Sequence, residues 1–423
     1  MALNDRAANR PAQQEIKAQP RRRRWWFTPL LVAVTLAICF GVAEGAIRIF
    51  WSSDYPKQPV RWQFDPELGL VHSPGSYNLP FRRCIDGRDC QDVLVKFTIN
   101  RQGFRSSNDY EEEPGRPLIA VLGDSMIEAA QVDDDKTTCS VLESQLRDKF
   151  PRVEVRNAGM NSSGFVHYYA RWQKLIADMH PDVLVIAALG INDFRNCSPH
   201  LENFVAMKPH YRFESGTREV WFEPVTSPHS RMRRFSASLY EGLELTRFLK
   251  WLSAASQQTN ASAGVSGIAA DAYIYEEPAS EHYKEAAELG REYLQRLILE
   301  AKAKGTRVVV VYLTWAGEAI DSQWNQMNAE YEAGSQAGRL VRTRPEQIVR
   351  EAAVGAGAEF VSFLEVAQRL TPEDRRSLWH SRVDNHLTER GNQLLGDTMA
   401  GAITTTLKGS DAGKQAARAG LNQ

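Results

Sequence analysis

The stretch PLIAVLGDS, residues 117–125, decides the fold class, because it joins an uninterrupted apolar run to a Gly-Asp-Ser turn. A short apolar run without polar alternation is typical of a strand that is buried on both faces of a sheet. The run ends at Gly123, where the chain can turn sharply away from the sheet edge. We therefore predict a central strand that leads directly into Ser125.

Four later segments repeat this pattern, and helical patterns lie between them. Strands are predicted at VEVRNAG (153–159), DVLVIAALG (182–190), RVVVVYLTW (307–315) and EFVSF (359–363). Helices are predicted near 138–150, 165–178 and 280–304, after Pro345, and from Thr388 to about 406. Strands that alternate with helices at this spacing are joined by right-handed crossovers into a parallel sheet. The sequence therefore predicts an α/β fold, a three-layer α/β/α sandwich around a central five-stranded parallel sheet.

The regions outside this pattern differ in composition. Residues 47–116 contain several prolines and only short apolar runs, which predicts a loop-rich lead-in wrapped on the domain. Residues 197–280 interrupt the alternation and are predicted as an insertion, with one amphipathic helix between Phe235 and Leu252. The α/β domain is therefore assigned to residues 117–406, and a flexible tail to 407–423.

The overall charge and the cysteine pattern exclude several classes of protein. The 423 residues include 51 Lys and Arg against 52 Asp and Glu, so no global positive field favours a nucleic-acid partner. Five scattered cysteines show no zinc-ligand spacing, and we expect no metal site.

The N-terminus has the pattern of a membrane anchor. Residues 1–24 carry seven basic against two acidic side chains, a net charge of about +5, and residues 25–43 carry no charge. Nineteen helical residues span about 28 Å, close to the hydrocarbon thickness of a bilayer. The prediction is a cytoplasmic segment 1–24, a transmembrane signal anchor 25–46 held by the lipid bilayer, and residues 47–423 outside the cytoplasm. The alternative is a cleaved signal peptide with a site at Ala43-Glu44-Gly45.

This placement bears on Cys84 and Cys90, which flank the short segment CIDGRDC. Disulfides form in extracytoplasmic compartments, so a local disulfide between these two cysteines is predicted. The alternative is a pair of free thiols in a surface turn.

Polar residues follow the predicted strands at the points where catalysis would need them. The blocks are Gly123-Asp124-Ser125, Asn157-Ala158-Gly159 with Ser162 beyond it, Gly190-Ile191-Asn192-Asp193, and Asp384-Asn385-His386. Active sites in open α/β sheets form at the carboxyl ends of the strands. A nucleophilic serine needs a base, an acid that orients the base, and preorganised donors for the oxyanion. All four components are expected at this edge.

These blocks resemble those of the SGNH (GDSL-type) hydrolase superfamily. The resemblance covers about 117–196 and 300–406 and implies a flavodoxin-like fold without cofactor or metal. It assigns Ser125 as nucleophile, His386 as base and Asp384 as acid, with the N–H groups of Ser125 and Ser162 and the amide of Asn192 as oxyanion donors. INRQGFR at 99–105 is similar to membrane-anchored bacterial members. This implies an inner-membrane protein with a periplasmic domain.

Two positions depart from the family pattern. Ser162 stands where many members have a glycine, which predicts that a glycine-only backbone geometry is lost while the N–H donor is kept. Val383 stands where many members have their acid, so Asp384, two residues before His386, is the available carboxylate. A Ser–His dyad with a backbone carbonyl orienting His386 is the alternative.

Other residues have less specific interpretations. Gly123, Asp124, Gly159, Gly190 and Asp193 are expected to support the loops. His380 is the rival base but is predicted to be a surface residue, and Glu128 is predicted to be a solvated carboxylate rather than a pocket residue. Tyr211, Phe213 and Trp221 are predicted to pack, with stacking on sugar rings as the alternative.

The sequence as a whole predicts a membrane-anchored serine esterase acting on an ester substrate, with an acylated glycan as a candidate. One alternative is an O-acyltransferase that modifies exported polysaccharide with the same residues. Another is a non-catalytic glycan-binding or assembly protein.

Overall fold

The structure is a computed structural model, in which two compact units are described separately. One comprises Met1–Ser53 and Tyr240–Leu252, and the other comprises Asp54–Leu239 and Ser253–Gln423. The described residues are 27–50, 61–65, 67–85, 89–111, 115–198, 201, 210–213, 220–223, 243–246, 248–249, 270–334, 338–380 and 384–420.

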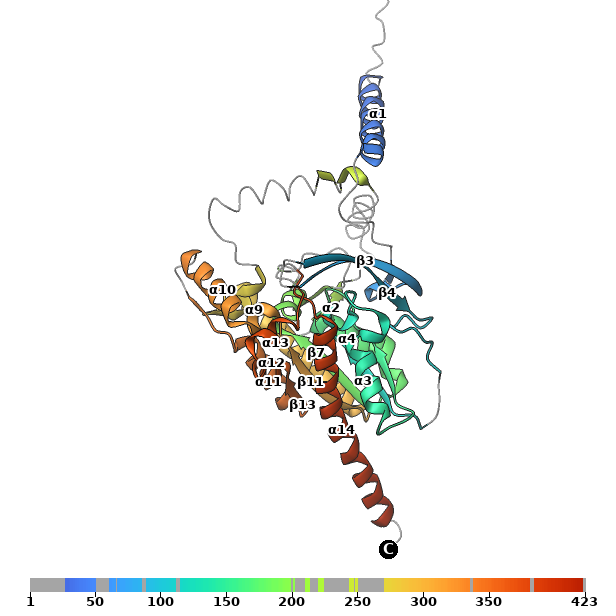
Figure 1. The fold of residues 1–423 in the computed structure, drawn as a ribbon, viewed down its shortest axis with the longest axis vertical. Helices are drawn as coiled ribbons and strands as arrows, with labels where there is room; N and C mark the ends of the chain where they lie inside the picture. The colour runs from blue at the N-terminus through green and yellow to red at the C-terminus, as the bar shows by residue number, and fades with distance from the viewer. Residues whose placement is uncertain are drawn as a thin grey trace, which may run out of the picture. The chain divides into compact units, whose positions relative to one another are not determined.

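A five-stranded parallel sheet forms the centre of the larger unit (Figure 1). Its strands are β5 (Leu118–Leu122), β6 (Glu154–Asn157), β7 (Val183–Leu189), β11 (Arg307–Leu313) and β13 (Glu359–Ser362). They are arranged in the order β13-β11-β7-β5-β6, and all four neighbouring pairs are parallel. This is the flavodoxin-like order, in which the first and third strands of the domain are neighbours. The five predicted strands and the fold class are confirmed.

Helices cover the sheet in two groups. In one group α3 packs against α14, and in the other α8 packs against both α4 and α11. The bounds are α2 Ser125–Glu128, α3 Thr138–Arg147, α4 Phe165–Arg171, α5 Gly190–Asp193, α8 Glu281–Ala303, α9 Ala316–Ala319, α10 Asp321–Gly334, α11 Arg344–Gly355, α12 Phe363–Gln368, α13 Pro372–Arg376 and α14 Glu389–Gly420.

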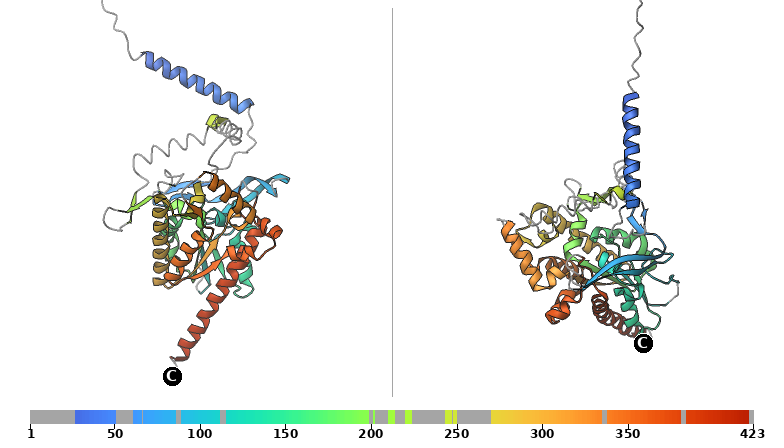
Figure 2. Two further views of the ribbon diagram at one scale, coloured as in Figure 1. Left: turned by 90° about the vertical axis from the view of Figure 1, so that its left-hand side faces the viewer. Right: turned by 45° about the horizontal axis from the view of Figure 1, so that its top comes forward.

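Local sequence explains several helix ends. The side chain of Thr137 caps α3, and Pro345 lies in the first turn of α11, where a missing N–H costs nothing. Gly305 follows α8 with a φ of 84°, the left-handed conformation that ends helices. The last helix was predicted to end near 406, but α14 continues to Gly420 and extends away from the domain (Figures 1 and 2). No proline interrupts this segment, which is rich in alanine, the best helix former.

The lead-in is built of strands rather than loops. Two antiparallel hairpins form, β1 (Trp62–Asp65) with β2 (Gly69–His72) and β3 (Gly75–Ile85) with β4 (Asp89–Ile99). Strand β4 alternates, with Val95, Phe97 and Ile99 buried together and the residues between them more exposed. This period of two is the signature of a half-buried strand. The backbone register places Cys84 directly opposite Cys90, and the disulfide stays a prediction.

Little of the insertion is described. β8 (His210–Phe213) pairs with β9 (Val220–Glu223), and β10 (Glu276–Glu277) pairs with β12 (Arg339–Leu340). The side chains of Tyr211, Phe213 and Trp221 lie outside the described residues, so their roles stay predictions. The predicted amphipathic helix is described only at 243–246 and 248–249.

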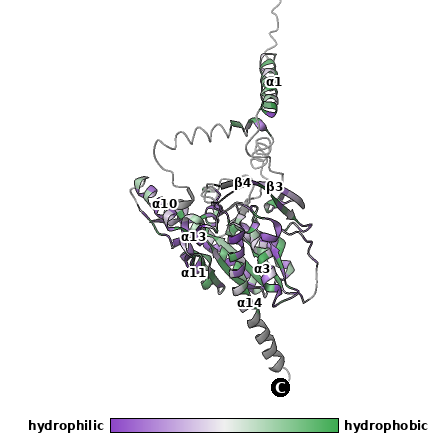
Figure 3. Ribbon diagram, viewed as in Figure 1, coloured by the Kyte–Doolittle hydropathy of each residue, from purple (hydrophilic) through white to green (hydrophobic). Residues whose placement is uncertain are grey.

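The smaller unit contains α1 (Phe27–Phe50), which by length and composition is able to cross a membrane. Its residues are mostly apolar, as the green colour of α1 in Figure 3 shows, and most of its large apolar side chains are exposed. Near its end, the carboxylate of Glu44 accepts hydrogen bonds from the backbone N–H groups of Glu244 and Leu245. Part of the insertion is thereby held on this helix.

The packing of α14 on α3 gives a test of the fold. A Cβ at Gly396 would lie 2.6 Å from Cγ1 of Val141, whereas one at Gly401 would meet nothing within 4 Å. We expect Gly396→Ala to lower the free energy of unfolding by about 1–3 kcal/mol through overpacking. The matched variant Gly401→Ala on the same helix should raise it by about 0.5–1 kcal/mol. Chemical denaturation of the full-length protein in detergent measures both, and equal effects would contradict this packing.

Candidate active site

Ser125 lies at the first position of α2, immediately beyond the carboxyl end of β5. Asp124 caps this short helix by accepting a hydrogen bond from the N–H of Met126 at 2.9 Å. Gly159 lets the loop after β6 pack against the turn, because a Cβ there would lie 2.4 Å from the backbone nitrogen of Glu128. The side chain of Asn157 adds a hydrogen bond to the carbonyl of Ile127 at 2.8 Å. The serine is therefore held on a turn fixed from two sides.

The loop before α14 brings His386 and Asp384 to this serine. Nε2 of His386 lies 2.8 Å from Oγ of Ser125, and Nδ1 lies 2.6 Å from Oδ1 of Asp384. Asn385 between them has a φ of 58°, a left-handed conformation that asparagine tolerates better than most residues. This turn lets a carboxylate only two residues away reach the imidazole. The backbone carbonyl of Asp384 also lies 3.1 Å from Nδ1.

The two ionisable groups shift each other's pKa. Burial alone would lower the pKa of His386, but the hydrogen bond and the charge of Asp384 raise it above the ordinary imidazole value. Burial alone would raise the pKa of Asp384, but the hydrogen bond and charge of His386 hold it below its ordinary value. The acid is thus ionised at neutral pH, and the imidazole is a stronger base than a free one.

Asn192 presents its amide toward the same turn from the end of β7. Its Nδ2 donates to Oδ2 of Asp124 at 2.7 Å, and its Oδ1 accepts from Arg195 and Asn196 at 3.0 and 3.1 Å. These partners fix which end of the amide carries the hydrogens. Since an amide nitrogen has two hydrogens, one remains available beyond the bond to Asp124.

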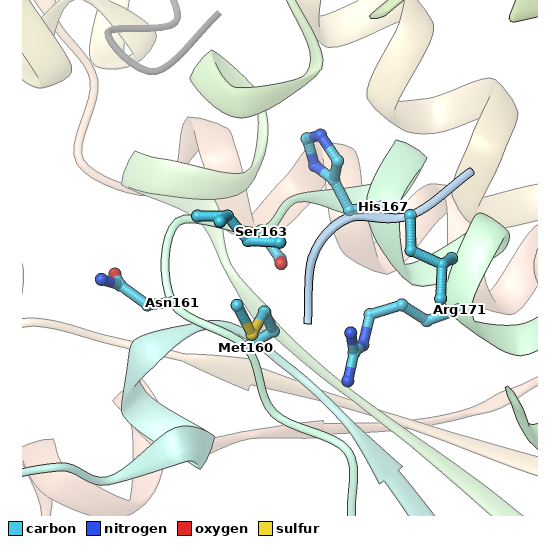
Figure 4. Close-up of a pocket in the computed structure, with 7 residues that line it drawn as sticks. Met160, Asn161, Ser163, His167 and Arg171 are labelled. Atoms are coloured by element: carbon cyan, nitrogen blue, oxygen red, sulfur yellow. The ribbon is translucent and has the colours of Figure 1, made fainter. Parts of the chain in front are cut away.

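Ser162 corrects a sequence prediction. Its φ is 55°, so the chain has the left-handed conformation that glycine favours although serine occupies the position. The glycine-type geometry is therefore retained. Beside this loop lies a small pocket of about 10 Å³, lined in part by Met160, Asn161 and Ser163 (Figure 4).

Gly190 and Asp193 support the loop that carries Asn192. Asp193 is fully buried and accepts hydrogen bonds from the N–H of Leu189 and the hydroxyl of Tyr168, at 2.9 and 3.0 Å. Burial raises its pKa well above the ordinary value. Gly190 is required because a Cβ there would lie 2.7 Å from the hydroxyl oxygen of Tyr312.

Two predictions made for neighbouring side chains are wrong. Glu128 is 1% exposed rather than solvated, and its carboxylate lies 3.0 Å from Nε2 of His72. His380 is 7% exposed rather than a surface residue, and the ring of Phe81 packs edge-on against it with centroids 4.9 Å apart. In both cases a lead-in residue covers the side chain. Burial lowers the pKa of His380 to about 4, so this imidazole is neutral at physiological pH.

Sequence reasoning also missed a buried carboxyl at the end of β11. Glu318 accepts hydrogen bonds from the hydroxyls of Tyr312 and Thr314, both at 2.8 Å, and is fully buried. Burial raises its pKa to about 8. The hydroxyl of Tyr312 lies close to Gly190, at the start of the loop that carries Asn192. Glu318 therefore supports this loop through its hydrogen bond with Tyr312. A glutamate within an apolar-flanked AGEAI segment gave no signal of this role.

Among the residues that the structure describes, no three His, Cys, Asp or Glu side chains gather as metal ligands would. The site that does assemble consists of a serine, a histidine, a carboxylate and amide donors. Such an arrangement is chemically able to perform nucleophilic attack by the serine with proton transfer to the histidine.

A model of the GDSL-like lipase/acylhydrolase family matches residues 121–394, well over half of the chain, and spans both Ser125 and His386. No curated protein matches.

Solved structures match at low identity. The acetyl xylan esterase AlAXEase is 14% identical, with 68% of this chain and 99% of that chain covered and a TM-score of 0.38. A lipase/acylhydrolase from Enterococcus faecalis is 13% identical, with coverages of 69% and 96% and a TM-score of 0.37. A catalytic mutant of an acetylxylan esterase from Geobacillus stearothermophilus is 14% identical, with coverages of 69% and 94% and a TM-score of 0.35.

Glu318 gives a test of the buried network. The folded protein keeps a proton on Glu318 up to about pH 8, whereas the unfolded chain loses it near the ordinary value of 4.5. Folding therefore takes up a proton between these values, and this group makes stability fall as pH rises through the window. We expect the free energy of unfolding of Glu318→Gln, relative to wild type, to increase from pH 5 to 8 and then to level off. Glu332 is exposed, so Glu332→Gln serves as the control. If the difference in free energy of unfolding between Glu318→Gln and wild type stayed constant from pH 5 to 9, the raised pKa of Glu318 would be contradicted.

Proposed function

Because the chain belongs to the GDSL-like lipase/acylhydrolase family, whose members hydrolyse esters, we propose that it is a serine esterase in which Ser125, His386 and Asp384 form the catalytic triad. The observation that carries this proposal is the continuous hydrogen-bonded line from Oγ of Ser125 through the imidazole to the carboxylate, with distances of 2.8 and 2.6 Å. This is the arrangement in which a histidine activates a serine.

In the first step, Oγ of Ser125 attacks the ester carbonyl while Nε2 of His386 takes the hydroxyl proton. The hydrogen bond at Nδ1 keeps the imidazole in the tautomer whose Nε2 is unprotonated before attack. The charge of Asp384 stabilises the imidazolium that results, which agrees with the raised pKa of His386.

The oxyanion formed on the carbonyl needs donors that are already in place. We assign this role to the backbone N–H groups of Ser125 and Ser162 and to the second hydrogen of the Asn192 amide. The left-handed φ of Ser162 and the fixed amide of Asn192 support the assignment.

The tetrahedral intermediate then collapses. The bond to the alcohol oxygen breaks, His386 returns its proton to the leaving alcohol, and an acyl-enzyme remains on Ser125. Water, deprotonated by the same imidazole, attacks the acyl group. The bond to Oγ of Ser125 then breaks, His386 returns the proton to Oγ, and the carboxylic acid leaves. Transfer of the acyl group to a sugar hydroxyl would use the same residues, and this stays a prediction from the sequence.

We also propose that α1 anchors the enzyme in the membrane, with the catalytic domain outside the cytoplasm. The exposed apolar length of α1 and the basic residues before it support this orientation.

Substitutions at the three site residues distinguish a Ser–His–Asp triad from a Ser–His dyad. Ser125→Ala and His386→Ala should each lower kcat for p-nitrophenyl acetate by about 10⁴-fold or more, because the nucleophile or its base is lost. Asp384→Asn should lower it by about 10²–10⁴-fold, since the charge that favours the imidazolium is removed.

Steady-state kinetics on folded, full-length variants give the comparison. If Asp384→Asn were nearly as active as wild type, the carbonyl of Asp384 would be sufficient to orient His386, and the triad would be refuted. If Ser125→Ala kept its activity, the serine mechanism itself would be refuted.

A separate prediction concerns topology. A C-terminal alkaline phosphatase fusion should be active, because that enzyme needs an oxidising compartment for its disulfides. A C-terminal green fluorescent protein fusion exported through the general secretory route should stay dark. The opposite pattern would place the catalytic domain in the cytoplasm.

A further inference from the structure

The described part of the lead-in, residues 61–65, 67–85 and 89–111, precedes the region that the family model matches. It contacts three parts of the site: the nucleophile turn (123–129), the oxyanion loop (159–164) and the acid–base loop, of which residues 377–380 and 384–388 are described. Resting on the proposed function, we propose that the lead-in is a positioning element of the active site, and that His72 is the residue through which it holds the nucleophile turn.

The first contact is made through Glu128. Its carboxylate lies 3.0 Å from Nε2 of His72 and 3.7 Å from Nε of Arg61, and all three side chains are buried. Although burial raises the pKa of Glu128, the hydrogen bond from His72 and the neighbouring arginines hold it below its ordinary value. For His72, burial has the opposite effect and lowers the pKa, because the charged form of an imidazole is the protonated one. A neutral His72 therefore donates its Nε2 proton to an ionised Glu128.

This bond reaches the nucleophile because α2 is only one turn long. Ser125 and Glu128 are its first and last residues, and Ala129 follows with a φ of 53°. The N–H of Ala129 donates to the carbonyl of Ser125 at 2.9 Å. A displacement of the Glu128 carboxylate therefore moves the whole turn, and Oγ of Ser125 with it.

The second contact is made beside the oxyanion loop. Leu68 and Leu70 of the lead-in line the small pocket beside that loop together with Met160 and Arg171, of which the last two are labelled in Figure 4. Arg171 is buried and donates to the carbonyl of Ala158 at 3.3 Å. Its charge also acts on both His72 and Glu128, so the first and second contacts share one electrostatic network.

The third contact holds the acid–base loop. Phe81 packs on His380 within the loop, and Arg83 forms an ion pair at 3.1 Å with Glu389, the first residue of α14 directly after it. The backbone N–H of His380 in turn donates to the carbonyl of His386 at 2.9 Å. The same lead-in thus contacts the segments that carry Ser125 and His386, which must stay in hydrogen-bond distance.

The test compares His72→Met with His72→Gln in the full-length protein in detergent. Methionine fills the site without a donor, whereas the amide nitrogen of glutamine is able to replace Nε2. With p-nitrophenyl acetate we expect His72→Met to lower kcat by about 10–100-fold with KM changed less than threefold, because a misplaced nucleophile slows chemistry rather than binding. His72→Gln should recover at least half of this loss on a logarithmic scale.

Loss of stability alone is excluded by assaying at a temperature where circular dichroism shows each variant fully folded. Arg101→Ala is the matched control, because its ion pair with Asp109 lies exposed on the same segment; it should keep kcat within twofold. If His72→Met does not fold, Phe81→Ala takes its place, with the same expected fall in kcat at unchanged KM. A folded variant with wild-type kcat would overturn the positioning role.

Failure of the proposed function gives a different result. In that case wild type itself would not hydrolyse the ester, and a fluorophosphonate would not label Ser125. A wild-type enzyme that is labelled and active, together with an equally active His72→Met, would refute the positioning role alone.

Discussion

The site depends on one hydrogen bond, between Nε2 of His386 and Oγ of Ser125, which joins residues 261 positions apart. Its length of 2.8 Å requires the turn after β5 and the loop before α14 to be fixed relative to each other. The parallel sheet meets part of this requirement, because β5 and β7 bring Ser125 and Asn192 to one edge. The loop that carries His386 follows α13 rather than a sheet strand, so other contacts must fix its position.

Buried carboxyl groups support the segments that carry Ser125 and Asn192, and their environments set different protonation states. Burial raises the pKa of Asp193 and of Glu318, whose partners are neutral hydroxyl and N–H groups. Glu128 has a lowered pKa because His72 and arginines surround it. A buried charge is tolerated only when it is paired, and a lone buried carboxyl takes up a proton instead. The fold thus supports the site with one buried carboxylate whose charge is paired, Glu128, and with buried carboxyl groups whose pKa is raised, Asp124 among them.

The sequence predicted the parts of this arrangement that are local. The apolar runs before Gly123 and Gly190 predicted two central strands. The polar blocks at their ends predicted that Ser125 and Asn192 lie at the same edge of the sheet. Residues whose environment comes from distant chain were predicted wrongly: Glu128 meets His72, 56 residues earlier, and His380 is covered by Phe81. The strands of the lead-in were missed although Val95, Phe97 and Ile99 alternate, because the prolines around them favoured loops. A polar residue beside a motif looks the same in sequence whether solvent or a hairpin faces it.

Backbone conformation adds a reason why a lead-in is needed at all. Within the described residues, four non-glycine residues have positive φ, and three of them, Ala129, Ser162 and Asn385, lie in the nucleophile turn, the oxyanion loop and the acid–base loop. Such a conformation costs on the order of 1–2 kcal/mol per residue and persists only where the surroundings enforce it. Each strained segment is also contacted by the lead-in, through Glu128, through the pocket wall of Leu68 and Leu70, and through His380. The contacts from the lead-in are therefore what hold these positive-φ segments in place. Without them, the loops would be free to relax away from the geometry that aligns Ser125 with His386.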